Sequence, residues 1–436
     1  MKRIAVVGSG IAGLAAARSL SRHATVTLFE AGDHFGGHSH TVDVTHDGIT
    51  HGVDCGFLVF NERTYPRLIA LFAELGVETA AADMTFSAQM PDAGIEWGGA
   101  NLNSVFAQRA NLVRPAFLNM LADVLRFNRV ATALATQGAA PGAAEGDDSV
   151  GDFLHRHRFG AAFRDWYFLP MIGCIWSCPT EQMLRFPVAT LLRFCHNHGL
   201  LQITDRPQWR TVRGGSRNYV AKMLASVDDA RLGSAVRRVR RLPVGGADVS
   251  TDRGTERFDA VVLAGHSDQS LALLADASED ERTVLGAIRF QPNRAILHTD
   301  IRVLPQRKAA WAAWNYERAQ HADGAEPAVC LHYLINRLQP LPFETPVIVS
   351  LNPVREPHAA SVQGEFHYSH PVFDRRALAA QARLPALQGR ADTWFCGAWT
   401  GYGFHEDGLA SGLGVAADIA ARIAGSPGAP AAAASP

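Results

Sequence analysis

The sequence predicts an α/β fold, in which a parallel sheet with a nucleotide-binding loop is interleaved along the chain with an α+β domain that contains an antiparallel sheet. Residues 3–7 form a short apolar run that ends in a glycine loop and an alanine-rich helical pattern. A second buried strand, residues 26–29, ends at an acidic residue. Strand-like runs between residues 289 and 351 lie far from both in sequence, which indicates a second sheet.

The glycine loop predicts a dinucleotide-binding site. Gly8 makes the turn after the first strand, Gly10 lets the backbone approach a pyrophosphate, and Gly13 packs the helix on the strand. The helix N-terminus then faces the phosphates, and Glu30, at the end of the next strand, can accept hydrogen bonds from a ribose diol. A purely structural turn explains the glycines less well, because strand, helix and acid are all in place. These residues predict a Rossmann-like domain.

A second glycine pair, Gly36-Gly37, follows Glu30 and gives another bare stretch of backbone along which a long cofactor can run. This pattern favours FAD over NAD. It resembles the amine oxidase and phytoene desaturase superfamily of flavoproteins, whose usual motif has Arg at the position of His38. The resemblance implies tight, non-covalent FAD binding by these residues: Gly8, Gly10, Ile11, Ala12, Gly13, Glu30, Ala31, Gly36, Gly37 and His38.

Three later segments resemble the remaining cofactor contacts of that superfamily. Asp54 and Gly56 match a turn beside the flavin, although a plain strand end explains them equally well. Val236 matches a strand residue that lies against the adenine. The closing motif, residues 393–414, contains a small-residue helix whose N-terminus suits the flavin's pyrimidine edge, where reduction places negative charge. The motif departs from the amine oxidases at Asp407, where they have glycine, and it adds these expected cofactor residues: Gly397, Gly408, Leu409 and Ser411.

Composition places the chain among ordinary globular proteins. Its 436 residues suffice for two domains, and a net charge of −1 with 47% hydrophobic residues gives no electrostatic case for nucleic acid. We expect a surface loop at residues 137–149 and a disordered Ala/Pro-rich tail. The expected boundaries are residues 1–80, 205–275 and 386–424 for the FAD domain, 81–204 and 276–385 for the substrate domain, and 425–436 for the tail.

The cysteines and the N-terminal region bear on location. Six cysteines without a disulfide framework suit a reducing compartment, and Cys174 and Cys178 lack the partner pair of a zinc site, so no metal is expected. The first strand begins two residues from the N-terminus, which leaves no room for a signal peptide, and no apolar run is long enough to span a bilayer. We expect a cytoplasmic protein, with contact to the inner face of the membrane left open.

A helical pattern over residues 115–136 is the basis for that open question. Its apolar stripe is typical of a helix that faces the core, and we favour this interpretation. A basic face toward anionic lipid is the alternative, because Asp123 is the one nearby acid among a group of cations: Arg109, Arg114, Arg126 and Arg129.

The middle of the chain predicts an apolar pocket. Residues 155–187 are dense in aromatic side chains and too poor in polar ones for a surface, so they form core or the wall of a pocket. Together with the aromatic residues of the closing motif, they supply the expected substrate-binding residues: Trp176, Trp399, Tyr402 and Phe404.

Over nearly the whole chain, the sequence is more similar to a bacterial group of predicted FAD-binding oxidoreductases than to the amine oxidases. Residues 54–61, 175–177 and 403–408 carry this resemblance. Members of the group are often associated with cyclopropane-fatty-acid-synthase-like methyltransferases, and one relative resembles the dehydrogenase of furan fatty acid synthesis. The resemblance implies a methylated, unsaturated acyl chain as substrate and a methyltransferase of the same pathway as a partner. The residues by themselves indicate only a flavoprotein with apolar walls.

Functions from three classes remain open. The favoured one is dehydrogenation of a lipid acyl chain, with hydride transfer to flavin N5 and a neighbouring base for the proton. The second is amine oxidation, which needs an aromatic cage and a polar entrance for the amine. The third is a flavoprotein that isomerises a double bond, or one without activity that accompanies a lipid methyltransferase. NAD(P)H is not expected as electron donor, because no second glycine motif of the required type follows a strand.

The expected proton acceptor is His405, with Glu406 as its orienting acid, because the closing loop is held near the flavin. The alternative for both residues is that they stabilise the loop and cap the following helix. His196 is the rival catalytic residue, near the end of a predicted helix that stops before Gly199.

Overall fold

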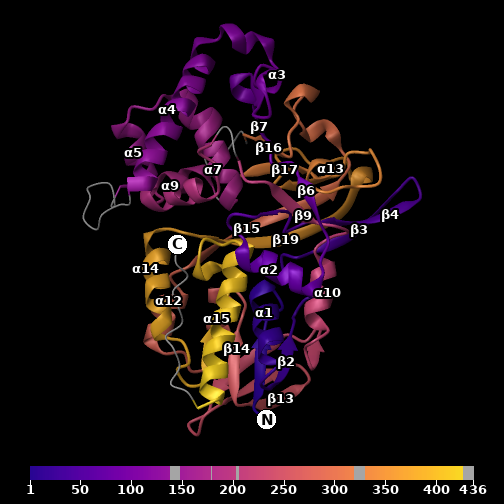
Figure 1. The fold of residues 1–436 in the computed structure, drawn as a ribbon, viewed down its shortest axis with the longest axis vertical. Helices are drawn as coiled ribbons and strands as arrows, with labels where there is room; N and C mark the ends of the chain where they lie inside the picture. The colour runs from indigo at the N-terminus through magenta and orange to yellow at the C-terminus, as the bar shows by residue number, and fades with distance from the viewer. Residues whose placement is uncertain (138–147, 178, 203–205, 319–328, 426–436) are drawn as a thin grey trace.

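The computed structural model describes residues 1–137, 148–177, 179–202, 206–318 and 329–425. Most of the expected loop at residues 137–149, the tail from residue 426 onward, and Cys178 therefore lie outside the described residues. Figure 1 shows two halves stacked along the long axis, a lower one around a parallel sheet and an upper one around a second sheet. The predicted fold class is confirmed.

The lower half is built on a five-stranded parallel sheet. In spatial order its strands are β10 (Asp229–Arg231), β2 (Thr25–Phe29), β1 (Arg3–Val7), β14 (Ala260–Leu263) and β20 (Thr393–Phe395). The central strand β1 is apolar on both sides: Ile4 and Val6 pack toward α1 (Ile11–Leu20), and Ala5 packs toward the opposite layer. The glycine loop follows the carboxyl end of β1, which is where parallel sheets bind their ligands.

Helix α15 (His405–Ile423) lies along α1 on one face of this sheet. The two helices touch at glycines. A Cβ at Gly412 would lie 2.1 Å from the carbonyl oxygen of Ala12, and a Cβ at Gly408 would lie 2.8 Å from Cγ2 of Ile11. Only glycine permits this approach, which brings the start of α15 next to the glycine loop. Two further helices lie on the same side: α2 (Pro66–Leu75) and α10 (Arg217–Leu224).

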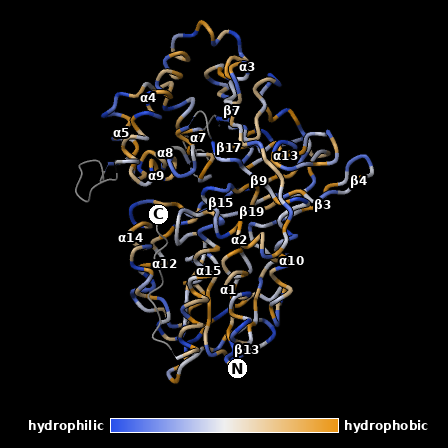
Figure 2. The backbone as a smooth tube through the Cα atoms, in the orientation of Figure 1, coloured by the Kyte–Doolittle hydropathy of each residue, from blue (hydrophilic) through white to orange (hydrophobic). Residues whose placement is uncertain are grey.

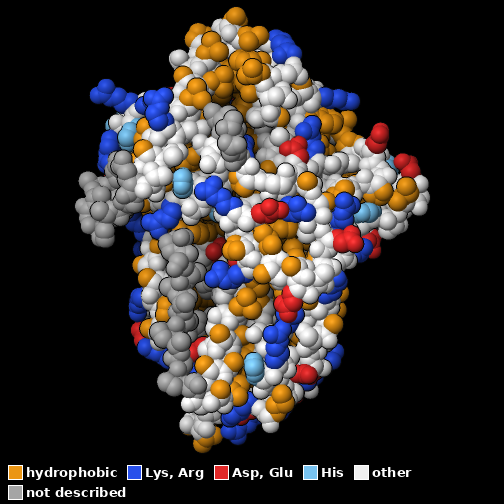
Figure 3. Space-filling view, in the orientation of Figure 1, with side chains coloured by type: hydrophobic (Ala, Val, Ile, Leu, Met, Phe, Trp, Pro, Cys, Tyr) orange, Lys and Arg blue, Asp and Glu red, His pale blue; other side chains and the backbone are white. Residues whose placement is uncertain are grey.

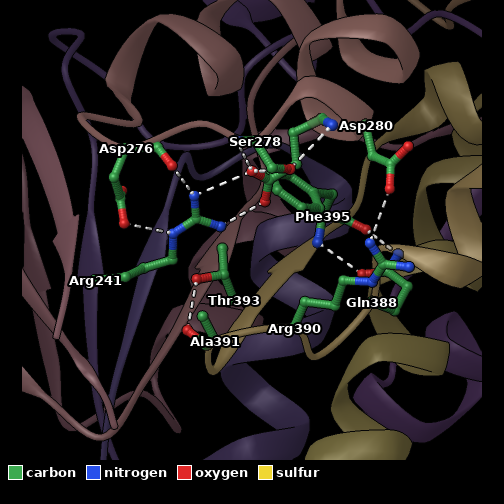
Figure 4. A network of polar contacts seen from close by, with 10 residues as sticks. Arg241, Asp276, Ser278, Asp280, Gln388, Arg390, Ala391, Thr393 and Phe395 are labelled. Atoms are coloured by element: carbon green, nitrogen blue, oxygen red, sulfur yellow. Dashed lines mark hydrogen bonds and ion pairs between the residues drawn. The ribbon is translucent and has the colours of Figure 1, made fainter. Parts of the chain in front are cut away.

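The opposite face of the parallel sheet is covered by a three-stranded antiparallel sheet and three helices: β11 (Val236–Arg241), β12 (Ala247–Thr251), β13 (Gly254–Phe258), α11 (Ser267–Leu273), α12 (Glu279–Leu285) and α14 (Arg375–Arg383). Figure 4 shows the polar network that ties these layers together. Arg241 donates to Glu281 at 2.5 Å and to Asp276 at 3.1 Å, and Arg390 pairs with Asp280 at 3.1 Å. These bonds fix α12 against the sheet.

A seven-stranded sheet forms the base of the upper half. Its spatial order is β19 (Val362–Val372), β15 (Arg289–His298), β18 (Ile348–Leu351), β17 (Cys330–Leu334), β16 (Trp314–Glu317), β7 (Phe86–Met90) and β8 (Ile95–Gly98). The expected antiparallel pairing holds except between β16 and β7, which run parallel. Short helix α13 (Ile335–Leu338) follows β17. This sheet faces the glycine loop across the waist of the molecule (Figure 1).

Helices pack on the upper sheet and complete this half: α3 (Leu102–Val105), α4 (Pro115–Gln137), α5 (Val150–Arg156), α6 (Ala161–Phe163), α7 (Leu169–Trp176), α8 (Thr180–Leu184) and α9 (Val188–Asn197). Phe117, Met120 and Phe127 of α4 are fully buried, so the predicted core face of this helix is confirmed. Figure 2 shows segments of hydrophobic residues in the interior of both halves. Among the described residues, no helix combines the length and hydrophobicity needed to cross a bilayer.

Two small sheets lie near the waist. The hairpin of β3 (Thr41–His46) and β4 (Ile49–Asp54) turns at Asp47-Gly48, where both residues have positive φ as its two-residue turn requires. The other sheet joins β5 (Phe60–Asn61), β9 (Trp209–Val212) and β6 (Thr79–Ala82), and so connects segments from two distant parts of the chain.

Candidate cofactor and substrate site

A cavity of about 420 Å³ runs from the glycine loop to the aromatic wall of the upper half, and we call it the inner cavity. Many of the predicted cofactor residues line it: Gly8, Gly10, Ile11, Ala12, Glu30, Gly36, Gly37, His38, Gly56 and Gly397. The sequence motifs therefore converge on one space, although they lie almost 400 residues apart at the extremes.

The glycines of this cavity have the distinct roles that the motif predicts. A Cβ at Gly10 would meet no atom within 4 Å, because the residue faces open space. A Cβ at Gly13 would lie 1.9 Å from the carbonyl oxygen of Gly8, so helix α1 approaches the turn too closely for any side chain. Gly36 pairs with Gly10 in a short bridge, and a Cβ at Gly37 would lie 3.2 Å from Cα of Gly10. The two bare backbone stretches form one cradle that fits a pyrophosphate.

The polar groups of the cradle also fit FAD. Helix α1 begins after Gly10 with no side-chain cap and no acid in its first turn, so its free N–H groups are available to phosphate oxygens. The Glu30 carboxylate accepts hydrogen bonds from Ser9 N at 3.0 Å and Gly32 N at 2.8 Å, which fixes it at the edge of the cavity. It retains acceptor capacity for a ribose hydroxyl.

Asp54 and Gly56 differ in what they do. Gly56 lines the inner cavity, and a Cβ there would lie 2.2 Å from the carbonyl oxygen of His38. Asp54 does not line it: its carboxylate accepts from Ser216 N at 2.9 Å and from Gln339 Nε2 at 3.0 Å. Burial raises the pKa of Asp54 to about 6. The prediction that Asp54 contacts the flavin is therefore corrected to a bracing role.

Several other predicted cofactor residues pack near the cavity without lining it. Gly408 supports the contact of α15 with α1, and Leu409 is buried in the same layer. The Ser411 hydroxyl accepts from Gly397 N at 3.1 Å and so holds the loop after β20. Ala31 is exposed. Val236 packs in the layer behind Phe29, and its contact with adenine stays a prediction.

His405 lines the inner cavity at the start of α15. Its Nε2 is 2.6 Å from the hydroxyl of Tyr219 and 3.4 Å from that of Ser39, and its ring stacks on Phe57 at 3.8 Å between centroids. Nδ1 has no hydrogen-bond partner among the residues that the structure describes. Burial lowers the pKa of His405 to about 3, so the imidazole is neutral. The ring is thus anchored on one nitrogen and free on the other.

The expected roles of Glu406 and of the helix cap need correction. The Glu406 carboxylate accepts from the backbone N–H groups of Arg67 at 2.9 Å and Leu68 at 3.0 Å, so it caps the N-terminus of α2 and does not orient His405. Asp407 is the residue that braces the closing loop, since it accepts from the N–H groups of Phe404 at 2.9 Å and Tyr402 at 3.1 Å. The side chain that departs from the amine oxidase motif therefore shapes the cavity wall.

Asp407 predicts a pH dependence of stability. Burial raises its pKa to about 7, above the usual value for an aspartate. The protonated Asp407 carboxyl contributes to the free energy of unfolding. This contribution is fully present below about pH 4 and is lost as the pH rises toward 7, because Asp407 ionises at a lower pH in the unfolded state. We expect the free energy of unfolding of Asp407→Asn to fall less than that of the natural protein between pH 5 and 8, by up to a few kcal/mol in denaturant titrations. Asp47→Asn, which changes an exposed acid of the β3–β4 hairpin, is the control. If the free energy of unfolding changed equally with pH in all three proteins, the assignment to Asp407 would be contradicted.

Burial lowers the pKa of the four other histidines that line the inner cavity as well: His38, His198, His266 and His370. His38 lines the cavity, lies 5.0 Å from the ring of Tyr368 and 5.2 Å from that of His370, and its Nε2 has no partner in the described part of the chain. Burial holds the pKa of His38 well below its usual range and lowers that of His370 to about 4. The sequence analysis did not single out His370, which lines the same cavity.

The upper end of the inner cavity is apolar. Its walls come from β16, β17, α7, α9 and the segments around β5, β6 and β9, and sequence analysis missed most of their side chains: Val59, Met84, Ile175, Phe194, Leu200, Trp209, Trp314 and Tyr333. Trp314 and Tyr333 stand opposite each other on β16 and β17, with ring centroids 5.0 Å apart. The period-two alternation of these strands is the signal that could have placed both rings on one face.

Four predicted side chains occupy different positions. Phe404 and Trp399 line the inner cavity, as expected of substrate-binding residues. Trp176 is buried behind the wall, where its Nε1 donates to the carbonyl oxygen of Tyr402 at 3.3 Å. His196 lines neither this cavity nor its neighbour. Trp176 and His196 are therefore corrected to positions outside the site.

A larger cavity of about 1040 Å³ adjoins the first, and we call it the outer cavity. It lies between α9, α14, α15 and the start of α2, and it is the cavity that Tyr402 lines. Tyr65, His198 and Phe404 line both cavities, so these side chains form the partition between them. The two cavities are therefore neighbours separated by these three side chains.

Three buried side chains of the upper sheet bring ligand-type atoms within 4.8 Å of one another: Glu317, Cys330 and His332. His332 Nε2 lies 3.2 Å from Glu317 Oε2 and 3.3 Å from Cys330 Sγ. Burial opposes a charge on His332, but Cys330 and Glu317 outweigh it and raise the pKa to about 9. His332 Nδ1 also lies 2.7 Å from the Ser350 hydroxyl, and Arg355 pairs with Glu317 at 3.3 Å, so the three side chains belong to a network of polar contacts. Sequence analysis considered only cysteine spacing and missed it.

Comparison with known proteins settles the family. The model of the family described as flavin containing amine oxidoreductase matches residues 11–300, which include Gly13, Glu30 and the Gly36-Gly37 pair. The chain belongs to this family. Its cofactor is FAD, in agreement with the prediction and with the cradle described above.

Curated relatives of this flavoprotein have different names. A carotenoid phi-ring synthase of Streptomyces griseus is 29% identical over 313 residues, and a Mycobacterium tuberculosis protein named as a flavin-containing monoamine oxidase is 30% identical over 272 residues. The matches cover 66% and 60% of this chain, and only 58% and 56% of the relatives. The relatives are therefore longer proteins, and the family does not by itself fix the substrate.

Solved structures show the same fold over 97% of the chain. Cyclohexylamine oxidase from Brevibacterium oxydans aligns with a TM-score of 0.70 at 16% identity, over 97% of this chain and 99% of that one. A fatty acid isomerase from P. acnes that produces CLA aligns with a TM-score of 0.64 at 17% identity, over 97% and 98%. Identities this low establish the fold alone.

Proposed function

We propose that this flavoprotein is an oxidoreductase that dehydrogenates an unsaturated, methylated fatty acyl chain. The observation that carries the proposal is the lack of charge in the inner cavity. Glu30 is the one acid among the described residues that line it, and Glu30 lies at the ribose end of the cradle. The five histidines that line the cavity are neutral because burial lowers their pKa values: His38, His198, His266, His370 and His405. An acyl chain gains from burial in such a space, whereas an ammonium ion would lose its water without a partner.

In this proposal, the residues of the chain bind the substrate, exclude water and accept the proton. Bound FAD supplies the acceptor for the hydride of the carbon–hydrogen bond that breaks. The apolar walls hold the acyl chain and keep water out. His405 takes the proton at Nδ1, because Nε2 is already engaged by the hydroxyl of Tyr219. Tyr219 is a positioning residue, and it has the role that sequence analysis assigned to Glu406.

Amine oxidation is the second candidate. The family description and the monoamine oxidase name of one relative favour it. Trp399 and Phe404 add aromatic surface to the inner cavity. The names of two others, a carotenoid ring synthase and a fatty acid isomerase, favour long unsaturated chains instead. We give the uncharged cavity more weight than the names of the relatives, because the cavity is a feature of this chain itself.

Anaerobic reduction of the bound flavin tests the proposal. We expect loss of the flavin's visible absorbance on mixing with a phospholipid that carries a methyl-branched, unsaturated acyl chain, and a product lighter by two hydrogens in mass spectrometry. The same phospholipid with saturated chains, putrescine, and NADPH alone are the comparisons, and none of them should bleach the flavin. Bleaching by putrescine but not by lipid would replace dehydrogenation with amine oxidation. A rearranged lipid of unchanged mass would replace it with isomerisation.

A further inference from the structure

We propose that the tip of the upper half docks on an anionic lipid surface. Apolar side chains are exposed there on α3, on the 3-10 helix Arg109–Val113 and on α4: Leu102, Leu112, Val113, Leu118 and Leu125. Val113 is 81% exposed and Leu102 is 77% exposed. Figure 3 shows hydrophobic side chains gathered at the top of the molecule, over α3 and the start of α4. We call this group of side chains the apolar tip.

The apolar tip is distinct from the core face of α4. Phe117, Met120 and Phe127 of this helix are fully buried, whereas Leu118 and Leu125 are exposed. Leu118 and Leu125 are seven residues apart, so they lie on one face, and Leu112 and Val113 precede that face at the helix start. The helix is thus apolar on two sides, although burial in the core explains only one of them.

Charge decides which surface suits the apolar tip. Residues 99–122 contain two arginines, Arg109 and Arg114, and no acid. The Arg109 guanidinium donates to Asn103 Oδ1 at 2.6 Å and to a carbonyl oxygen, and that of Arg114 donates to the carbonyl oxygen of Gly94 at 3.1 Å. Neither of these acceptors carries a charge. Exposed apolar residues beside uncompensated arginines are typical of surfaces that insert into an anionic lipid headgroup layer.

The occupant is therefore a membrane surface and not a second copy of the chain. Two copies joined through the apolar tip would bring arginines of equal charge together without an acid between them, which costs free energy. Phospholipid headgroups with negative charge compensate the arginines, and the acyl region accepts the leucines and Val113. This inference rests on the surface and does not depend on the proposed reaction.

Vesicle sedimentation with the FAD-loaded protein tests the inference. We expect binding to vesicles of phosphatidylglycerol and phosphatidylcholine, weaker binding to phosphatidylcholine alone, and at least tenfold weaker partitioning for Val113→Asp. Val244→Asp is the matched control, because Val244 is also 81% exposed but lies in the hairpin between β11 and β12. Flavin absorbance shows whether each variant is folded. If Val113→Asp does not fold, Leu125→Ser replaces it in the experiment.

Arginine variants test the electrostatic part of the inference. Arg109→Gln with Arg114→Gln should weaken binding to the anionic vesicles and reduce its salt dependence, while Arg238→Gln, an exposed arginine of β11, should not. No sedimentation of the natural protein with anionic vesicles would overturn the inference. Equal loss in Val113→Asp and Val244→Asp would overturn it too. So would a dimer in analytical ultracentrifugation that Val113→Asp dissociates.

Discussion

Gly10→Val is expected to give folded protein without FAD. The position has an extended backbone, with φ −60° and ψ 173°, that a valine adopts without strain, and a Cβ there would meet no atom of the protein within 4 Å. The side chain would instead fill the cradle in front of the α1 N-terminus. We expect FAD affinity to fall by roughly 100-fold or more, which is about 3 kcal/mol. Flavin absorbance after purification and calorimetric titration of the apoprotein with FAD measure this loss.

Two other glycines separate loss of the cofactor from loss of the fold. Gly414→Val, in α15, also meets no atom within 4 Å but does not face the cradle, so this variant should retain FAD. Gly13→Ala should instead destabilise the protein by at least about 2 kcal/mol, because its Cβ would lie 1.9 Å from the Gly8 carbonyl oxygen. Normal FAD content in Gly10→Val would mean that the pyrophosphate does not lie against this turn.

His405→Ala should retain FAD and lose most of the flavin reduction by substrate. A positioned general base contributes about 10²–10⁴ to a rate, and we expect a loss in this range in anaerobic stopped-flow experiments. Because burial lowers the pKa of His405 to about 3, the base is neutral throughout the physiological range. Its ionisation should therefore not reduce the rate between pH 8 and 5.5, in contrast to a solvent-exposed histidine.

Neighbouring residues give the controls for His405. Tyr219→Phe removes the hydrogen bond to Nε2, so it should lower the rate of flavin reduction while FAD binding stays unchanged. Glu406→Gln should lower stability by about 1 kcal/mol through the α2 cap and leave the reduction rate unchanged. His196→Ala should have no effect, since this residue lines neither cavity. A normal reduction rate in His405→Ala would remove this residue from the reaction.

The cofactor half of the site was predictable because its signal is local. Gly8, Gly10 and Gly13 specify a turn, a close approach and a helix contact within six residues, and Glu30 follows at the end of the next strand. The Gly36-Gly37 pair then lies against Gly10, as an extended cofactor site requires. Short-range steric requirements of this kind can be recognised from the sequence alone.

The substrate half was not predictable in the same way. Trp176 and Ile175 are adjacent in sequence, yet Ile175 lines the inner cavity and Trp176 is buried behind it. Glu406 follows His405, but the helix turn directs its carboxylate to the N-terminus of α2. Which side of a helix meets a cavity depends on tertiary packing, and no pattern within the segment specifies it. Family resemblance supplied the residue types but not their directions.

The contact between α15 and α1 has a consequence for synthesis of the chain. Helix α1 ends at residue 20, and the glycines that let α15 pack against it are at residues 408 and 412. While the ribosome is still translating, one face of the nucleotide domain has no cover, and its apolar side chains remain in water. The cover of this face is complete only after residues 408–412 have left the ribosome. We therefore expect stable FAD capture only after that point of synthesis.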